Sequence, residues 1–236
     1  PSYFRVVCLA NDIPDGFEKQ VEAWLDRFPK RYEELRNILD ENPIFLDRIK
    51  NIGAISQSDA IALGLTGPNL RATGVAYDVR KAFPYMGYET YDFDVPVGKN
   101  GDTYDRYIVR MEEMWESYKI CRQALNRLPE GPWRVDDRKI VMPPKHEVRE
   151  SMESLIHHFK IASYGFDVPA GEVYVSLESP RGEFGVYLVS NGGNKPWRVR
   201  TRPPSFYNVF AIPTMLKGNL IADLLAVVAT VDPVFG

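Results

Sequence analysis

The chain has 236 residues, and its 29 Lys and Arg against 32 Asp and Glu give a formal net charge of −3. This balance argues against nucleic-acid binding through a basic face, because phosphate affinity depends on an excess of Lys and Arg. Two cysteines, Cys8 and Cys121, with three histidines are too few for a disulfide framework, a four-cysteine zinc site or an iron–sulfur cluster held by this chain alone, so we expect no metal of its own.

The first half of the chain, about residues 14–128, has a helical pattern. Apolar residues recur at three- and four-residue steps over residues 13–39, and Pro29 is expected to kink or end this helix. Asn42, followed by a proline, predicts the cap of a second, short helix. Ser58 predicts the cap of a third.

A loop and a long helix complete this half. Residues 83–101 are rich in proline and glycine, which disfavours regular structure, but they also carry several tyrosines. We therefore expect an ordered loop that is packed by its aromatic rings. Asp102 is the predicted N-cap of a helix over Tyr104–Leu128.

Residues 133–236 combine helices with strands. A helix is predicted over Val148–Ala162, and its inward face is expected to carry Met152, Leu155, Ile156 and Phe159. Two β-rich runs, Val173–Leu177 and Phe184–Val189, are joined by a turn, and a third strand is expected over Trp197–Arg202. Together the three runs predict a small antiparallel sheet.

The last predicted element is a helix over Pro213–Ala229, apolar almost all round and therefore expected to be buried. The most apolar segment, Leu220–Val231, is interrupted by Asp223 and is shorter than the roughly 20 residues that cross a bilayer. The elements predict an α+β fold: a mainly helical bundle with a small antiparallel sheet near the C-terminal part.

Familiar metal and hydrolase motifs are not supported. His157 and His158 are neighbours on a predicted helix, where side chains diverge by about 100° and cannot easily share one ion. His146 and Glu147 begin like a zinc-protease signature, but Glu150 stands where the second histidine belongs. Neither a phosphate-binding glycine loop after a strand nor a Gly-x-Ser-x-Gly elbow is found.

Two charged residues resist a purely structural interpretation. Arg181 lies in the turn between the first two predicted strands, and Asp232 follows the apolar closing helix. A carboxylate next to a buried helix is unfavourable unless it is paired or protonated. One hypothesis is that Arg181 and Asp232 meet in a pocket, where Asp232 exchanges protons with a polar head group. The alternative, that Asp232 only caps a helix end, stays open.

A series of sequence runs carries a family resemblance. They are Gly74–Lys81 (GVAYDVRK), Pro84–Tyr88 (PYMGY), Phe93–Val97 (FDVPV), Gly101–Tyr107 (GDTYDRY), Arg110–Met114 (RMEEM), Ser151–Lys160 (SMESLIHHFK), Pro180–Ser190 (PRGEFGVYLVS) and Asp232–Gly236 (DPVFG). In this order, and over essentially the whole chain, they resemble the C-terminal part of the D subunit of NADH-quinone oxidoreductase, the hydrogenase-like quinone-site subunit of respiratory complex I.

The resemblance implies a fold, a substrate and partners. Residues 1–236 would be the C-terminal segment of one domain of the nickel–iron hydrogenase large-subunit type that has lost its metal. The chain would line a quinone cavity beside the terminal iron–sulfur cluster of a hydrogenase-small-subunit-like partner. NADH and the clusters would be bound by other subunits of the peripheral arm, and membrane-arm subunits would pump protons. The expected location is peripheral, on the cytoplasmic face of the bacterial inner membrane or the matrix face of the mitochondrial one.

The resemblance also assigns individual residues. Arg181 matches a basic position of the quinone-cavity loop, and Ser190 matches another position associated with that site. Asp232 and Val234 match the C-terminal segment that lines the cavity, with Asp232 a candidate for charge or proton relay together with Arg181. Val234 stands where the hydrogenases have a nickel-binding cysteine. Arg5 matches an arginine that approaches the terminal cluster.

Some positions depart from the family pattern. Val7 and Cys8 stand where Gly-Gly is usual, and Asn208 stands where many members have histidine. The tyrosine and histidine that bind the quinone head group belong to an N-terminal half that this chain lacks, so we expect the isolated chain to be inactive. Two alternatives stay open: a divergent, non-catalytic assembly module, and a membrane-bound hydrogenase relative, which would need paired cysteines at both ends.

Overall fold

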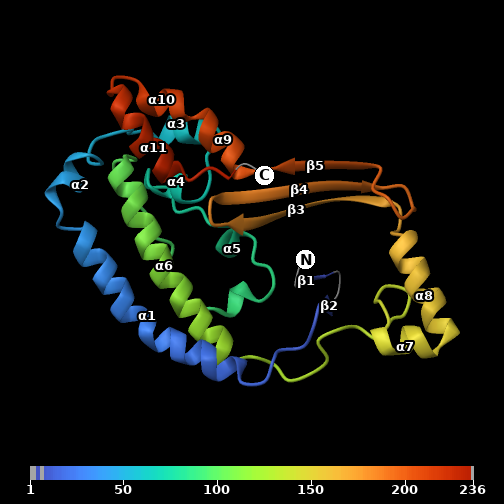
Figure 1. The fold of residues 1–236 in the computed structure, drawn as a ribbon. Coiled ribbons are helices and arrows are strands. Elements are labelled where there is room, and N and C mark those ends of the chain that lie inside the picture. The colour runs from blue at the N-terminus through green and yellow to red at the C-terminus, as the bar shows by residue number, and fades with distance from the viewer. Residues whose placement is uncertain (1–3, 6–7, 235–236) are drawn as a thin grey trace. The chain divides into compact units, whose positions relative to one another are not determined.

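The computed structural model describes residues 4–5 and 8–234. In chain order the elements are β1 (Phe4–Arg5), β2 (Cys8–Leu9), α1 (Phe17–Leu39), α2 (Pro43–Asp47), α3 (Gln57–Ala62), α4 (Pro68–Arg71), α5 (Val79–Ala82), η1 (Tyr88–Thr90), α6 (Thr103–Leu125), α7 (Lys145–Glu150), α8 (Met152–Ser163), β3 (Gly171–Ser179), β4 (Gly182–Ser190), β5 (Arg198–Arg202), α9 (Pro204–Phe210), α10 (Ile212–Leu216), η2 (Ile221–Asp223) and α11 (Leu224–Val231). About half of the chain is helical, and β3, β4 and β5 form a three-stranded antiparallel sheet, which confirms the α+β class (Figure 1).

The chain divides into two compact units. The larger, called the helical unit here, consists of residues 20–127, 175–186 and the described part of 201–236. Its apolar core lies among α3, α4, α10 and α11 and contains Leu65, Leu70, Met215, Val227 and Val231, all buried. The predicted caps are present: the Asp102 side chain accepts from the Asp105 amide at the start of α6, and the Asn42 side chain accepts from two amides at the start of α2. The third predicted cap is displaced, because Ser56 rather than Ser58 caps α3.

Helices α1 and α6 lie side by side within this unit (Figure 1). Their contact is aromatic: Phe28 stacks on Tyr118 with ring centres 5.3 Å apart, and Tyr32 lies 5.3 Å from Trp115. Pro29 was expected to kink or end the first helix. It does not end it, because α1 continues through Pro29 to Leu39. The aromatic contacts on both sides of the proline hold the two halves of the helix against α6.

The loop over residues 83–101 is ordered and packed by its rings, as predicted. Tyr88 makes edge-to-face contacts with Tyr85, Tyr91 and Phe93, with ring centres 5.0–6.3 Å apart. The guanidinium of Arg80 lies over the Phe93 ring at 4.9 Å. These contacts fix a segment whose backbone forms only one short 3-10 turn.

The smaller unit, called the hairpin unit here, consists of residues 128–174, 187–200 and the described part of 1–19. The predicted helix over Val148–Ala162 is two helices, α7 and α8, because Ser151 adopts an extended conformation and caps α8 by accepting from the Ser154 amide. The four residues expected to face inward from α8 are all exposed: Met152, Leu155, Ile156 and Phe159. The apolar spacing was correct, but the described part of the chain supplies no layer to cover that face.

The closing segment also differs from the expectation of one buried helix. It is divided into α10, η2 and α11, and Gly218, at φ +85°, ends α10 in a conformation that side chains disfavour. Val227 and Val231 are buried, whereas Ile221 is 91% exposed and Leu225 is 78% exposed. Among the described residues, no helix combines the length and the apolar character needed to cross a membrane.

Candidate functional site

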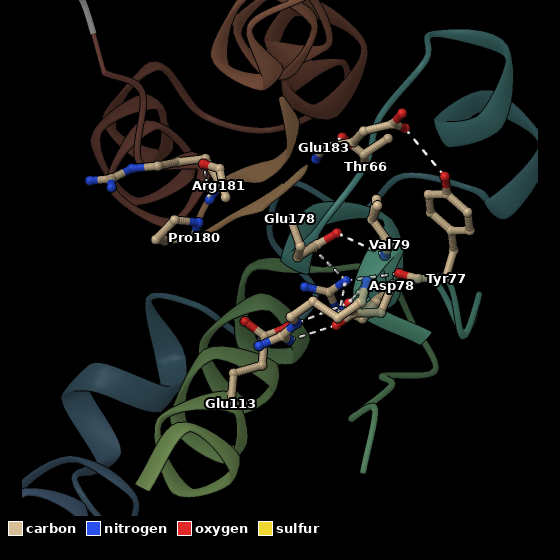
Figure 2. Close-up of polar contacts among 12 residues, drawn as sticks. Thr66, Tyr77, Asp78, Val79, Glu113, Glu178, Pro180, Arg181 and Glu183 are labelled. Carbon is tan, nitrogen blue, oxygen red and sulfur yellow. Dashed lines mark hydrogen bonds and ion pairs between the residues drawn. The ribbon is translucent and has the colours of Figure 1, made fainter. Parts of the chain in front are cut away.

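The turn between β3 and β4 is held in place by two glycines. Gly182 has φ +129° and Gly67 has φ +65°, and a Cβ on either one would collide with the backbone of the other segment. The Glu183 amide donates to Thr66 Oγ1 at 3.0 Å, and Figure 2 shows this contact beside the turn. Arg181 therefore projects from a turn whose backbone is fixed against the start of α4.

Arg181 and Asp232 meet, as the sequence hypothesis proposed. Arg181 Nε lies 3.1 Å from Asp232 Oδ2, and the two side chains are 32% and 43% exposed. Asp232 is also the C-cap of α11, with φ +51° and its amide donating to the Val228 carbonyl at 3.0 Å. Asp232 therefore forms an ion pair with Arg181 and also caps α11, so both alternatives are present. Aspartate is one of the non-glycine residues that adopt the left-handed region, and its place at the end of α11 accounts for this backbone conformation.

The pair lies at the edge of an apolar cavity of about 660 Å³ in the helical unit. The lining residues are Ser179, Arg181, Phe184, Pro203, Pro204, Ser205, Phe206, Val209, Phe210 and Val234. Arg181 is the charged member of this lining, and Val234 supplies part of its apolar surface. The Val234 amide donates to Ser205 Oγ at 3.1 Å, which ties the end of the described chain to α9.

Asn208 supports the same turn from α9. It is fully buried, and its Nδ2 donates to the Arg181 carbonyl at 3.1 Å. Asn208, which stands where the resemblance expects histidine, therefore donates a hydrogen bond to the backbone of the turn.

Two other predicted site residues belong to the hairpin unit. Ser190 is at the opposite end of β4 from the turn and belongs to the hairpin unit. Its hydroxyl donates to the Val168 carbonyl at 3.0 Å and accepts from the Gly192 amide at 3.2 Å. Arg5 is paired with Cys8 in the β1–β2 ladder, and Val7 lies outside the described residues. Within the helical unit the structure thus brings Asp232 to Arg181, beside a cavity that Arg181 and Val234 line, and the roles of Ser190 and Arg5 stay predictions.

Arg110, which no sequence pattern singled out, is a second cation beside the Arg181–Asp232 pair. Arg110, on α6, places Nη1 3.8 Å from Asp232 Oδ2, and its Nη2 donates to the Thr230 carbonyl at 3.1 Å. Burial lowers the pKa of Arg110, and the charge of Asp232 partly opposes that shift. The sequence signal that could have drawn attention to Arg110 is its helical spacing from Arg106, because the two arginines are four residues apart on one face of α6.

A second charged cluster is buried behind the turn. Arg71 donates to Glu113 at 2.7 Å and to Glu178 at 2.9 Å, and lies 3.7 Å from Asp78. Burial raises the pKa of Glu113 and of Glu178 in spite of the arginine. Burial also opposes ionisation of Asp78, but its hydrogen bond with Arg80 and the charges of Arg80 and Arg71 lower its pKa. Figure 2 shows Glu113 and Glu178 converging while Arg181 points away from them.

Metal ligands do not gather in this part of the chain. Over residues 4–5 and 8–234, no group of three or more His, Cys, Asp or Glu side chains is arranged to hold an ion. The polar groups of the cavity lining are the Arg181 guanidinium and the hydroxyls of Ser179 and Ser205, with phenylalanine, proline and valine around them, and the Asp232 carboxylate lies against the guanidinium. This composition suits an apolar molecule with a polar or negatively charged head.

The fold and this cavity define the class: an α+β protein in which an apolar cavity is edged by an arginine–carboxylate pair. Comparison with known proteins identifies the particular family. A family model described as "Respiratory-chain NADH dehydrogenase, 49 Kd subunit" matches residues 1–236, so the chain belongs to that family, and the membership expected from the sequence is confirmed.

Several curated relatives are named as D subunits of NADH-quinone oxidoreductase. D subunit 1 of Symbiobacterium thermophilum is 56% identical over 237 residues, which cover 100% of this chain and 59% of the relative. The D subunit of Citrifermentans bemidjiense is 53% identical and that of Acidiphilium cryptum is 50% identical, with 60% and 58% of those relatives covered. The chain therefore spans about three fifths of the length of these relatives.

Proposed function

We propose that this chain is part of the quinone-reducing subunit of a proton-pumping NADH:quinone oxidoreductase, and that the cavity beside Arg181 forms part of its quinone site. The observation that carries the proposal is the pairing of Arg181 with Asp232 at 3.1 Å on the edge of an apolar cavity of about 660 Å³. A quinone has the matching character, with a polar head and an apolar body or tail.

The chemistry of the pair fits this substrate. Reduction of a quinone adds two electrons and two protons, and negative charge builds on its oxygens before the protons arrive. Arg181 offers N–H donors that stabilise such charge, most strongly where apolar walls exclude water. Asp232, which is 43% exposed, is within reach of both solvent and Arg181 and is the candidate for proton exchange.

The remaining parts of the proposal concern the assembly. The electrons come from NADH through iron–sulfur clusters that other peripheral-arm subunits hold, and the terminal cluster lies on a hydrogenase-small-subunit-like partner near Arg5. Residues 1–236 form a segment of one domain with the fold of the nickel–iron hydrogenase large subunit. Its place is peripheral, on the cytoplasmic face of the bacterial inner membrane or the matrix face of the mitochondrial one, in contact with membrane-arm subunits.

Replacing Asp232 tests the proposal in the assembled enzyme. Asp232→Asn keeps the shape but removes the acid, so quinone reduction is expected to fall by about a hundredfold, the scale typical of a lost general acid. Asp26→Asn is the matched control, because Asp26 also pairs with an arginine, Arg122 at 2.6 Å, but lies on an exposed surface. Normal turnover and proton pumping in a correctly assembled Asp232→Asn enzyme would contradict a role in the reaction.

That contradictory result would favour the second candidate, a non-catalytic assembly module. The observation behind it is the exposed apolar surface of the closing helices, which includes Ile221 and Leu225. Surfaces of this kind mark contacts with other proteins. The two candidates therefore differ in whether Asp232 affects turnover or only assembly. The third, a metal-bearing hydrogenase relative, is opposed by Val234 at the cysteine position.

A further inference from the structure

The end of α11 is clamped by two arginines of α6. Arg106 is fully buried, and its Nε donates to Thr230 Oγ1 at 3.2 Å. Arg110, one helical turn further along, donates from Nη2 to the Thr230 carbonyl at 3.1 Å and to the Val231 carbonyl at 3.4 Å. These carbonyls belong to the last turn of the helix, where a cation is electrostatically favoured. The clamp closes directly before Asp232.

Arg110 also contacts both halves of the site. Its Nη1 lies 3.8 Å from the Asp232 carboxylate and 3.5 Å from the carbonyl of Pro180, the residue that precedes Arg181 in the turn. The Arg110 guanidinium thus joins the segment that carries Asp232 to the turn that carries Arg181. Because the fork of a guanidinium is rigid, it restrains direction as well as distance.

The same arginine faces the buried cluster. The pKa of Arg110 is lowered by burial, raised by Asp232 and Glu113, and lowered again by Arg181 and Arg71. The cluster has Arg71 and Arg80 as cations against Asp78, Glu113 and Glu178 as anions, a formal charge of −1. Adding the cations Arg110 and Arg181 and the anion Asp232 makes the whole set neutral when every member is ionised.

We propose that Arg110 is the positioning residue that fixes Asp232 against Arg181 and joins this pair electrostatically to the buried Arg71 cluster. The inference rests on the proposed function, since it assigns a role within the same site. Removing the charge of Arg110 changes the net charge of the whole set from zero to −1. It also leaves Asp232 without its second cation. Burial already raises the pKa of Glu113 and of Glu178, and loss of Arg110 raises that of Glu113 further.

The test compares two substitutions in the assembled enzyme. Arg110→Gln removes the charge and the fork, whereas Arg110→Lys keeps the charge and loses the fork. Arg122→Gln is the control, because Arg122 is on the same helix and also binds a carboxylate, that of Asp26 at 2.6 Å, at the surface. Each enzyme is measured by hydrogen–deuterium exchange over residues 224–234 and by quinone turnover against pH.

Both readouts are expected to change. Exchange over residues 224–234 rises in Arg110→Gln and less in Arg110→Lys, because the clamp on the Thr230 and Val231 carbonyls is weakened. The kcat for quinone falls by about tenfold or more in Arg110→Gln, as expected for a displaced reacting group, and its pH profile moves to higher pH. Arg110→Lys keeps the wild-type pH profile, and Arg122→Gln changes neither readout.

Two results would overturn the inference. Faster exchange with unchanged kcat per assembled enzyme and an unchanged pH profile would make Arg110 a structural clamp only. Unchanged exchange would show that Arg110 does not hold the segment at all. A wild-type assembly that reduces no quinone contradicts the proposed function instead, and the exchange comparison then still decides whether Arg110 holds Asp232.

Discussion

Arg71 and Arg181 lie in the same helical unit and both bind carboxylates, but their surroundings are opposite. Arg71 is 1% exposed and contacts Glu113, Glu178 and Asp78, so its charge is fully used inside the protein. Both arginines line cavities, but the Arg181 side chain is 32% exposed and pairs with one carboxylate. The difference separates a cation that holds the fold from a cation that remains available to a ligand.

The largest expected effect comes from breaking the buried cluster. Arg71→Leu removes the shared cation from Glu113, Glu178 and Asp78, whose side chains are 18%, 4% and 2% exposed, and is expected to lower the free energy of unfolding by about 3–5 kcal/mol. Denaturant unfolding of the full chain measures this. The surface variant Arg122→Leu is the control and should change stability by about 1 kcal/mol or less. Equal effects of the two substitutions would contradict the distinction between buried and exposed pairs.

The turn that carries Arg181 gives the next effect. Gly182→Ala places a Cβ against Thr66 at φ +129°, and is expected to cost about 1–3 kcal/mol of stability while displacing Arg181. Gly192→Ala is the control, because Gly192 also has a positive φ but has open space around its Cα. Thermal or denaturant unfolding measures both variants. A Gly182→Ala chain as stable as the Gly192→Ala chain would show that the close approach to Thr66 does not hold the turn.

A smaller effect depends on pH. Burial raises the pKa of Glu113 above its ordinary value of 4.5, so the folded chain binds this proton more tightly than the unfolded chain does. The stability gained from that proton is present at low pH and is lost as pH rises through the raised pKa. Glu113→Gln removes the titration. The free energy of unfolding of the wild type, minus that of Glu113→Gln, should therefore fall over the interval that begins near the ordinary pKa of 4.5 and ends at the raised pKa. A difference that rises over this interval would contradict the stated shift.

The smallest effect on folding is expected at the exposed pair. Arg181→Gln loses one half-exposed contact, so its unfolding free energy should change by about 1 kcal/mol or less, although quinone turnover of the assembled enzyme should fall strongly. Unfolding and turnover measured on the same variant separate the two roles. A large loss of stability without a specific loss of turnover would place Arg181 beside Arg71 as a fold-holding residue.

Local signals in the sequence predicted much of the fold. The caps at Asn42 and Asp102 and the hairpin around Arg181 depend on residues within a few positions of one another, and all three are present. The inward face of α8 and the burial of the closing helix were wrong, since periodicity shows that a face is apolar but not whether the same chain covers it.

The site was predicted only in part, for a different reason. The family resemblance indicated Arg181 and Asp232, and the structure brings them together. Arg110 was not recognised, because its contact with Thr230 joins residues 120 positions apart and no spacing rule reaches that far. Ser190, assigned by the same resemblance, makes hydrogen bonds within the hairpin unit, and its role at the site stays a prediction.

Photolabelling of the assembled enzyme with a quinone that carries a photoreactive group on its head is the most direct test of the account. The account predicts that labels fall on the lining of the Arg181 cavity, in residues 179–184, 203–210 and 234, and that excess unlabelled quinone suppresses them. Labels confined to a second cavity of the helical unit, at Trp24, Phe28 and Tyr118, would contradict it.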